Sequence, residues 1–260
     1  MIESVPLDDR GLLLGDGLFE TLLWRGGELV LAGEHAQRMQ VGAATLGLPA
    51  PTLAEFVGCA TAAVGAAGLK AARAAVRVTL TAGSGGRGLD RPASLAPRLF
   101  ATAAVSVRPD TPARLIIART ARNQASPASR LKTLAYLDSV LARREAMLAG
   151  ADEAVMLNTR GELACAAAAS LFWVSDSVIF TPSVEAGCLD GIMARQVIAA
   201  AARLGLDCRQ VLEGESALAA ADAIFITNSL IGLRPAYLAD RPYRAHPIIV
   251  KLMDALAAVV

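Results

Sequence analysis

The chain has 260 residues, of which 54% are hydrophobic, and its formal net charge at pH 7 is +1. A chain of this length and apolar content can bury a sizeable core in one large domain or in two smaller ones. The near-zero charge, without a long basic run, argues against nucleic acid or an anionic membrane surface as the partner and favours a small-molecule substrate.

The N-terminal pattern and the cysteine content narrow the class further. The first residues, "MIESVPLDDRG", lack the basic region and apolar core of a signal peptide, and the most apolar run, residues 163–174, is too short to span a bilayer. We therefore expect a cytoplasmic protein. The four cysteines form no CxxC pair and the two histidines form no ligand cluster, so neither a disulfide framework nor a metal site is expected.

Apolar periodicity in the first part of the chain predicts strands interspersed with helices. The segment "RPDTPA" then places two prolines and an aspartate between strand-like runs. We therefore expect a linker at residues 109–113, between a small α/β domain at 1–108 and a larger one at 114–260. The expected elements of the small domain are strands at 19–24, 28–32, 74–82 and 98–107, and helices at 33–48 and 53–69.

The larger domain also mixes the two periodicities, which gives an α/β fold (α+β in some schemes) for the whole chain. Lys132 stands just before a helical stretch in which Leu134, Leu137, Val140 and Leu141 share one face. A cation at that end opposes the helix dipole, so Lys132 gains little there as a structural charge. Strands are expected at 114–120, 153–158, 170–181 and 223–229, with a further helix from Gly191.

Three local patterns suggest an anion site. Gly191 ends a turn and opens a helix, so the backbone amides of Ile192 and Met193 are candidate donors. The turn with Asn228 and Ser229 follows a strand and offers amide and hydroxyl groups. Arg38, which shares a predicted helix with His35, supplies a cation.

The glycine-rich segment "TAGSGGRGLDRP" follows a predicted strand. It lacks the GxxxxGK[ST] pattern and no clear helix follows it, which argues against a P-loop. We interpret it as a flexible loop that carries Arg87 toward an anionic substrate.

Taken in order, the motifs resemble those of class IV pyridoxal-phosphate enzymes, a group that includes branched-chain aminotransferases, D-amino-acid aminotransferases and 4-amino-4-deoxychorismate lyase. The resemblance covers nearly the whole chain, and two of the motifs, "GSGGRG" and "NSLIGLRP", look most like the lyase. The segments that carry it are "DDRGLLLGDGLFETL", "EHAQRM", "GSGGRG", "LKTLAYLDSVLARREA", "LFWV", "AGCLDGIMARQV" and "FITNSLIGLRP".

The resemblance implies a two-domain class IV aminotransferase-like fold with pyridoxal 5'-phosphate in the cleft between the domains, and a homodimer. It implies that Lys132 binds the cofactor covalently and then moves protons. The 5'-phosphate would be held by Arg38, by the helix start at Gly191 with the amides of Ile192 and Met193, and by the turn at Asn228 and Ser229.

One departure from the family pattern bears on the chemistry. The resembling enzymes place a glutamate against the pyridine nitrogen, and counting back from "SLFW" puts Cys165 there, with Ser170 in place of the usual asparagine. Glu162 does not replace the missing carboxylate, because on a strand it points to the opposite face. A neutral thiol supports a carbanion on the ring poorly, so transamination suffers more than elimination.

The sequence therefore favours a lyase that converts 4-amino-4-deoxychorismate to 4-aminobenzoate and pyruvate, with Arg87 and Arg234 as candidate ligands of the substrate carboxylates. Two alternatives stay open. One is a class IV aminotransferase of D- or branched-chain amino acids. The other is a homologue whose catalysis is altered or lost because Cys165 replaces the usual glutamate.

Overall fold

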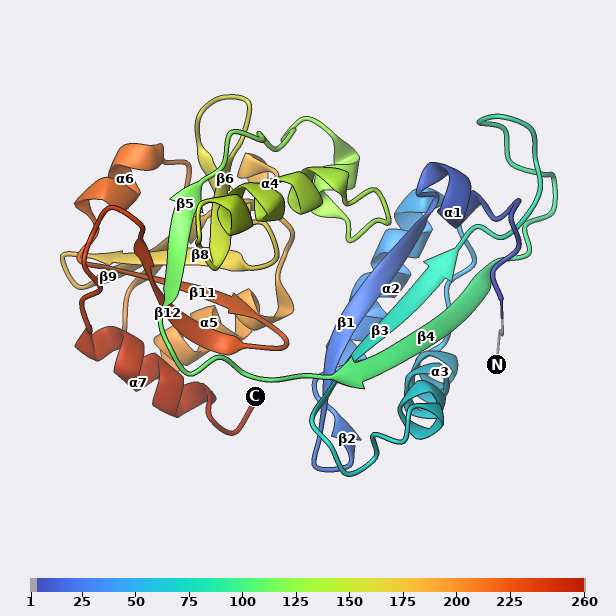
Figure 1. Cartoon of the computed structure of the whole chain (residues 1–260), viewed down its shortest axis with the longest axis horizontal. Helices are drawn as coiled ribbons and strands as arrows, with labels where there is room; N and C mark the ends of the chain where they lie inside the picture. Colours follow the sequence, from blue (N-terminus) through green and yellow to red (C-terminus); the bar gives the residue numbers. More distant parts are fainter. Residues whose placement is uncertain (1–3, 260) are drawn as a thin grey trace. The chain divides into compact units, whose positions relative to one another are not determined.

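A computed structural model describes residues 4–259 and divides them into two compact units (Figure 1). The first unit runs to Val107 and includes Leu131–Ala135, whereas the second contains Arg108–Arg130 and the chain from Tyr136 onward. Both units combine helices with β-sheet, which confirms the expected α/β class.

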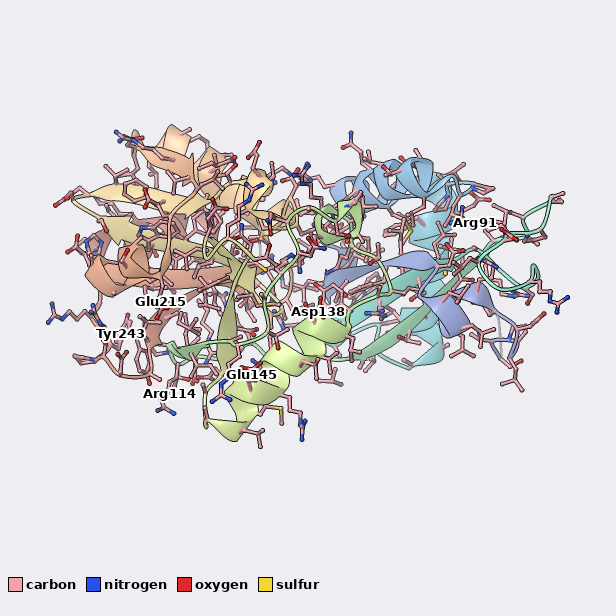
Figure 2. The ribbon with its side chains drawn as sticks, turned by 90° about the horizontal axis from the view of Figure 1, so that it is seen from above. Arg91, Arg114, Asp138, Glu145, Glu215 and Tyr243 are labelled. Carbon is pink, nitrogen blue, oxygen red and sulfur yellow. The ribbon has the colours of Figure 1, made fainter. Side chains whose placement is uncertain are left out.

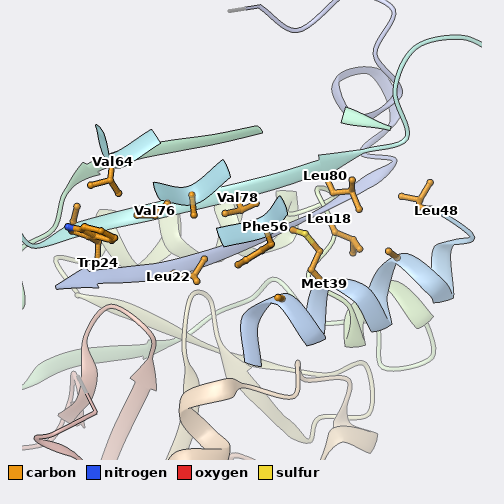
Figure 3. Close-up of a cluster of buried hydrophobic side chains, with 14 of the residues drawn as sticks. Leu18, Leu22, Trp24, Met39, Leu48, Phe56, Val64, Val76, Val78 and Leu80 are labelled. Carbon is orange, nitrogen blue, oxygen red and sulfur yellow. The ribbon is translucent and has the colours of Figure 1, made fainter. Parts of the chain in front are cut away.

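The first unit is a four-stranded antiparallel sheet in the order β2-β1-β3-β4, with two helices on one face. Alternate residues of β1, including Leu18 and Leu22, pack against Met39 and Phe56 of these helices (Figure 3). The elements are α1 (Arg10–Leu14), β1 (Gly17–Arg25), β2 (Glu28–Leu29), α2 (Ala32–Leu46), α3 (Leu53–Ala66), β3 (Ala74–Thr81) and β4 (Arg98–Val105).

The second unit is an eight-stranded mixed sheet in the order β10-β9-β8-β11-β12-β5-β6-β7. Phe172 and Phe225 of neighbouring strands stack 4.8 Å apart in a core that α5 and α7 cover. The elements are β5 (Ala113–Ile117), η1 (Pro127–Arg130), α4 (Leu137–Leu148), β6 (Glu153–Leu157), β7 (Leu163–Ala166), β8 (Ser170–Ser175), β9 (Val178–Pro182), η2 (Val184–Ala186), α5 (Ile192–Arg203), β10 (Cys208–Val211), α6 (Glu215–Ala220), β11 (Ala223–Asn228), β12 (Gly232–Leu238) and α7 (Pro247–Leu256).

The division into units differs from the expected boundary at Lys132. The expected larger domain, 114–260, was to carry this lysine, but residues 131–135 belong to the first unit. The reason is a short antiparallel pairing in which Leu18 of β1 lies opposite Thr133. Hydrogen bonding to a strand far away in the sequence has therefore decided the unit to which Lys132 belongs.

Two expected elements also differ from the structure. The strand expected at 28–32 is limited to Glu28–Leu29, because Leu31 adopts a left-handed conformation and α2 begins at Ala32. Helix α4 begins at Leu137, five residues after Lys132 rather than directly after it. Its buried face consists of small residues, Ser139, Ala142 and Ala146, which let the helix lie close to β6.

The apolar face expected for this helix is exposed. Leu137, Val140 and Leu141 are 67%, 56% and 41% accessible, respectively. Within residues 4–259, no helix is both long enough and apolar enough to cross a membrane.

Candidate functional site

Lys132 is fixed to β1 by its main chain. The N–H of Phe19 donates to the carbonyl of Lys132 (2.9 Å), and the N–H of Leu134 donates to the carbonyl of Gly17 (3.0 Å). The Nζ of Lys132 lies 4.3 Å from the centre of the Phe19 ring, and the guanidinium carbon of Arg77 lies 3.6 Å from the same centre. The lysine is therefore held on both sides by backbone hydrogen bonds and beside an aromatic ring.

Gly17 makes this pairing possible because nothing larger fits. A Cβ at this position would lie 2.3 Å from the carbonyl oxygen of Leu80 and 2.9 Å from a methyl carbon of Leu134. Both distances are too short for real contacts, so any side chain would push the Lys132 segment or β3 away from β1.

A buried carboxylate, Glu20, joins β1 to α2. Its two oxygens accept from Nε and Nη2 of Arg38 at 2.8 and 2.7 Å, and Nδ1 of His35 lies 2.6 Å from Oε2. The side chains of Glu20 and His35 are each 1% exposed, and that of Arg38 is 16% exposed. The sequence suggested Arg38 as the cation of an anion site. In the structure, the bidentate pair with Glu20 orients its guanidinium.

The charges of this group follow from burial and pairing. Burial opposes ionisation of Glu20, but hydrogen bonds from Arg38 and His35 outweigh it and hold the pKa of Glu20 at about 2, below its ordinary 4.5. Burial lowers the pKa of His35 against the opposing pull of Glu20, and the charges of Arg38 and Lys132 lower it further. His35 is therefore neutral, with Nδ1–H donating to an ionised Glu20.

In the second unit, the turn between β7 and β8 brings several expected site residues together. Strand β7, which contains Cys165, leads into this turn. After the turn, Ser170 begins β8 and lies opposite Thr227 of β11. The turn is close to the start of α5, because a Cβ on Gly191 would lie 2.5 Å from Oγ of Ser170. The side-chain amide of Asn228 also donates to the carbonyl of Ala168 in the same turn (3.0 Å).

The N-terminus of helix α5 has features that are typical of an anion-binding site. Gly191 is its N-cap and supplies no side-chain acceptor, and the following residues, Ile192 and Met193, are buried. The first amides of this twelve-residue helix therefore lack a side-chain cap, as the sequence analysis expected for Ile192 and Met193.

Asn228 is used differently from the expectation. Its side-chain oxygen accepts from the N–H groups of Leu230 (2.9 Å) and Ile231 (3.0 Å) and so forms the turn itself. The Asn228 side chain therefore shapes the turn, and phosphate binding by Asn228 and Ser229 stays a prediction.

Cys165 lies on β7 opposite Met156 and is 9% exposed. Burial raises the pKa of its thiol, and although Arg122 opposes this effect, Glu153 adds to it. Burial likewise raises the pKa of Cys188 to about 12, and Cys165 contributes. Cys165 is therefore a neutral thiol at pH 7. Glu162 does not replace the expected glutamate, because it precedes β7 and its carboxylate accepts from the side-chain amide of Asn158 (2.7 Å).

The two candidate substrate arginines are placed very differently. Arg87 is exposed in the glycine-rich loop. Arg234 donates to the carbonyl of Thr111 (2.7 Å) and pairs with Asp152 (3.2 Å), so its guanidinium holds the start of β5. The role of Arg234 as a ligand of a substrate carboxylate stays a prediction, as does that of Arg87.

Two charged residues that organise the first unit, Glu20 and Arg10, were not predicted from the sequence. Glu20 could have been found, because it is a charged residue of an apolar strand, on the same face as Leu18 and Leu22. Arg10 could not, because its partners are mostly main-chain carbonyls. No group of histidine, cysteine or carboxylate side chains in the described part of the chain could hold a metal ion.

Comparison with known proteins identifies the family. A model of amino-transferase class IV matches residues 17–237. The chain therefore belongs to the class IV aminotransferase family, whose members depend on pyridoxal phosphate, and the resemblance seen in the motifs is confirmed.

The similar proteins carry the names of two kinds of enzyme, an aminotransferase and a lyase. A Methanocaldococcus jannaschii protein named provisionally as a branched-chain-amino-acid aminotransferase is 31% identical over 242 residues, covering 91% of this chain and 83% of that protein. Aminodeoxychorismate lyase of Vibrio harveyi is 27% identical over 236 residues, covering 89% and 86%. A crystal structure from Legionella pneumophila, named provisionally as a 4-amino-4-deoxychorismate lyase, has a TM-score of 0.92 at 28% identity and covers 100% of this chain and 97% of its own.

Replacing Gly17 with alanine should destabilise the protein, because the added methyl group meets a backbone oxygen at 2.3 Å. We expect the free energy of unfolding to fall by about 1–3 kcal/mol in urea denaturation. Gly33→Ala is the matched control, since no atom lies within 4 Å of its Cβ position. Equal stability of Gly17→Ala and the parent would contradict the close packing of β1 against the Lys132 segment.

The buried Glu20 should also shape the acid stability of the protein. Because its pKa is depressed from 4.5 to about 2, its stabilisation is fully present above pH 4.5 and is lost as the pH falls toward 2. This loss amounts to about 3 kcal/mol. Urea unfolding at several pH values should show that Glu20→Gln is less stable at pH 7 and that the difference from the parent shrinks across this window. The exposed Glu28→Gln should follow the parent, and a constant Glu20→Gln difference would refute the assignment.

Proposed function

We propose that this protein is a pyridoxal-phosphate-dependent lyase that converts 4-amino-4-deoxychorismate to 4-aminobenzoate and pyruvate. The observation that carries the proposal is the neutral, buried thiol of Cys165. We propose that this thiol lies beside the pyridine nitrogen, and the resemblance of the motifs supports this position. The similarity to aminodeoxychorismate lyase of Vibrio harveyi over 89% of the chain supports it. The two products together contain every atom of the substrate, so the reaction requires no oxidant and no second substrate.

The donor groups of the chain fit the proposed cofactor. A primary amine at Lys132 matches its aldehyde, while the guanidinium of Arg38 and the uncapped start of α5 at Gly191, Ile192 and Met193 match a phosphate. When bound, the cofactor supplies an electron sink for the bonds around the substrate amine carbon. We propose the backbone of Asn228 and Ser229 as a further phosphate contact.

Lys132 is the proposed proton carrier. Its amine removes the proton from the amine-bearing carbon of the substrate and returns a proton as pyruvate leaves. The two main-chain hydrogen bonds around it restrict the movement of its backbone, so its reach is set by the side chain alone. Arg87 is the proposed ligand of a substrate carboxylate.

Cys165 favours elimination over transamination for an electrostatic reason. A thiol kept neutral by burial has no charge with which to hold a proton on the pyridine nitrogen. Transamination needs the electron pair to stay on the cofactor, whereas elimination passes it to the leaving group. The product ring of 4-aminobenzoate is aromatic, which adds driving force.

The second candidate function is transamination of D- or branched-chain amino acids. It is favoured by the 31% identity to the Methanocaldococcus jannaschii relative, whose name is that of an aminotransferase. A protein that binds the cofactor but has lost catalysis is the third possibility, and it rests on Cys165 alone.

We further propose that the protein is a homodimer. Leu137, Val140 and Leu141 form an exposed apolar face on α4, the helix that also carries Asp138 and Glu145 (Figure 2). A contiguous apolar patch on a protein surface is typical of a site of protein–protein contact.

Borohydride treatment of the protein loaded with pyridoxal phosphate should fix the cofactor on Lys132 and abolish the visible absorption band. Peptide mapping identifies the modified lysine, and Lys132→Ala is the control that should take up no stable adduct. An adduct on another lysine would overturn the assignment.

The same loaded protein then separates the candidate functions. With 4-amino-4-deoxychorismate, we expect equal amounts of 4-aminobenzoate and pyruvate, and no product from Lys132→Ala. Conversion of the cofactor to its amine form by leucine or D-alanine, without lyase products, would support the aminotransferase instead. A loaded protein inert toward every donor would support the binding protein.

A further inference from the structure

The glycine-rich loop of the first unit was expected to be flexible. In the structure it is closed around one buried side chain. Arg10, the first residue of α1, is 5% exposed. Its Nη1 donates to the carbonyls of Asp90 (2.9 Å), Gly85 (3.4 Å) and Gly88 (3.4 Å), and its Nη2 donates to the carbonyl of Leu89 (2.9 Å). Four carbonyl oxygens of a single loop therefore converge on one guanidinium.

Arg10 is itself held by a carboxylate. Its Nε donates to Asp16 at 2.9 Å, and Asp16 also pairs with Arg91 at 2.5 Å. The hydrogen bond from Arg91 lowers the pKa of Asp16 against the effect of burial, and Arg10 lowers it further. The charge that anchors Arg10 therefore persists at neutral pH.

The helix that carries Arg10 is tied to the sheet. Asp9 caps α1 by accepting from Gly11 (2.8 Å) and Leu12 (3.3 Å). The same buried carboxylate accepts from the hydroxyl of Thr81 (2.9 Å) and pairs with Arg98 (3.0 Å), which are residues of β3 and β4. The guanidinium of Arg10 is therefore a fixed point relative to the sheet, and the loop is built on it.

The glycines allow the loop carbonyls to point inward. Gly86 has a φ of +82°, and a Cβ there would lie 2.1 Å from the carbonyl oxygen of Asp90 and 2.9 Å from Nη1 of Arg10. Gly83 has the same φ, and its Cβ would lie 2.0 Å from the carbonyl oxygen of Ala96. Only glycine fits these positions, so the sequence is specialised for one loop conformation.

Arg87 lies in this loop between Gly86 and Gly88, directly before the turn at residues 88 and 89, and its backbone pairs with that of Asp90. It is exposed, and no carboxylate in the described residues pairs with its guanidinium. A guanidinium held outward on a preformed loop can bind a carboxylate without first ordering the chain, which strengthens binding.

We infer that Arg10 is a positioning residue that sets the affinity for substrate carboxylate by holding the loop that presents Arg87. The inference rests on the proposed role of Arg87, which applies equally to a lyase and to an aminotransferase because the substrates of both carry carboxylates. Arg10 does not touch substrate, so its effect passes through Arg87.

A double-mutant cycle tests this coupling. Arg10→Met removes the donors at similar length, Arg87→Met removes the proposed ligand, and the double variant carries both changes. KM and kcat are measured with 4-amino-4-deoxychorismate or, should transamination prove to be the activity, with the amino donor that is turned over. Arg73→Met, which affects an arginine bonded to Ser106 at the end of β4, is the matched control.

We expect Arg10→Met and Arg87→Met each to raise KM by about tenfold to a hundredfold, the range for losing an oriented contact to a charged group. In the Arg87→Met background, Arg10→Met should change KM by less than about twofold, because its effect passes through Arg87. The dissociation constant of pyridoxal phosphate should be unchanged in all variants, and kcat nearly so.

Two failures are distinguishable. If Arg87→Met leaves KM unchanged, the proposed role of Arg87 is wrong and the inference fails with it. If Arg87→Met raises KM but Arg10→Met does not, or if the two effects add, Arg87 keeps its role and Arg10 has only a structural one.

A second readout needs neither substrate nor cofactor turnover. In Arg10→Lys, which keeps the charge but has fewer donors, trypsin should cut after Arg87 about tenfold faster than in the parent, because the loop is less firmly held. Mass spectrometry of the fragments follows the cut. Equal cleavage rates would overturn the inference, and this holds even if Arg10→Met does not fold.

Discussion

The pairing of Gly17–Phe19 with Lys132–Leu134 is the constraint on which the proposed site depends. It is made of two main-chain hydrogen bonds, and it exists only because Gly17 has no side chain to separate the segments. The next residue of the same strand, Glu20, then holds Arg38 and neutral His35 on α2. One short length of β1 therefore places both the proposed cofactor lysine and the proposed phosphate arginine.

In the second unit, the expected site residues are brought together by a turn. There the turn between β7 and β8 gathers Cys165, Ser170, the Gly191 start of α5 and the Asn228 turn. Its residues are small, which allows main-chain groups to approach closely. The neutral thiol of Cys165 lies in this setting, at the position where the motif resemblance leads us to expect a glutamate. Its chemistry bears on which reaction the protein performs.

Local signals in the sequence predicted much of the fold, and long-range pairing accounts for most of what they missed. Helix α3, expected at 53–69, spans Leu53–Ala66, and its start is marked by a capping box from Thr52 to Glu55. No local signal shows that Lys132 hydrogen-bonds to a strand over a hundred residues earlier, so the sequence did not group it with the first unit. The partners of Arg10 and Arg234 were hidden for the same reason, because carbonyl groups carry no mark in a sequence.

The central claim is that the neutral thiol of Cys165 favours elimination over transamination, and the ratio of the two rates in Cys165→Glu tests it most directly. Both rates are measured in the folded, cofactor-loaded variant and in the parent, with Cys188→Ser as the control for a neighbouring buried thiol. A carboxylate at position 165 would hold a proton on the pyridine nitrogen, so the account predicts that transamination rises relative to elimination. An unchanged ratio would contradict it.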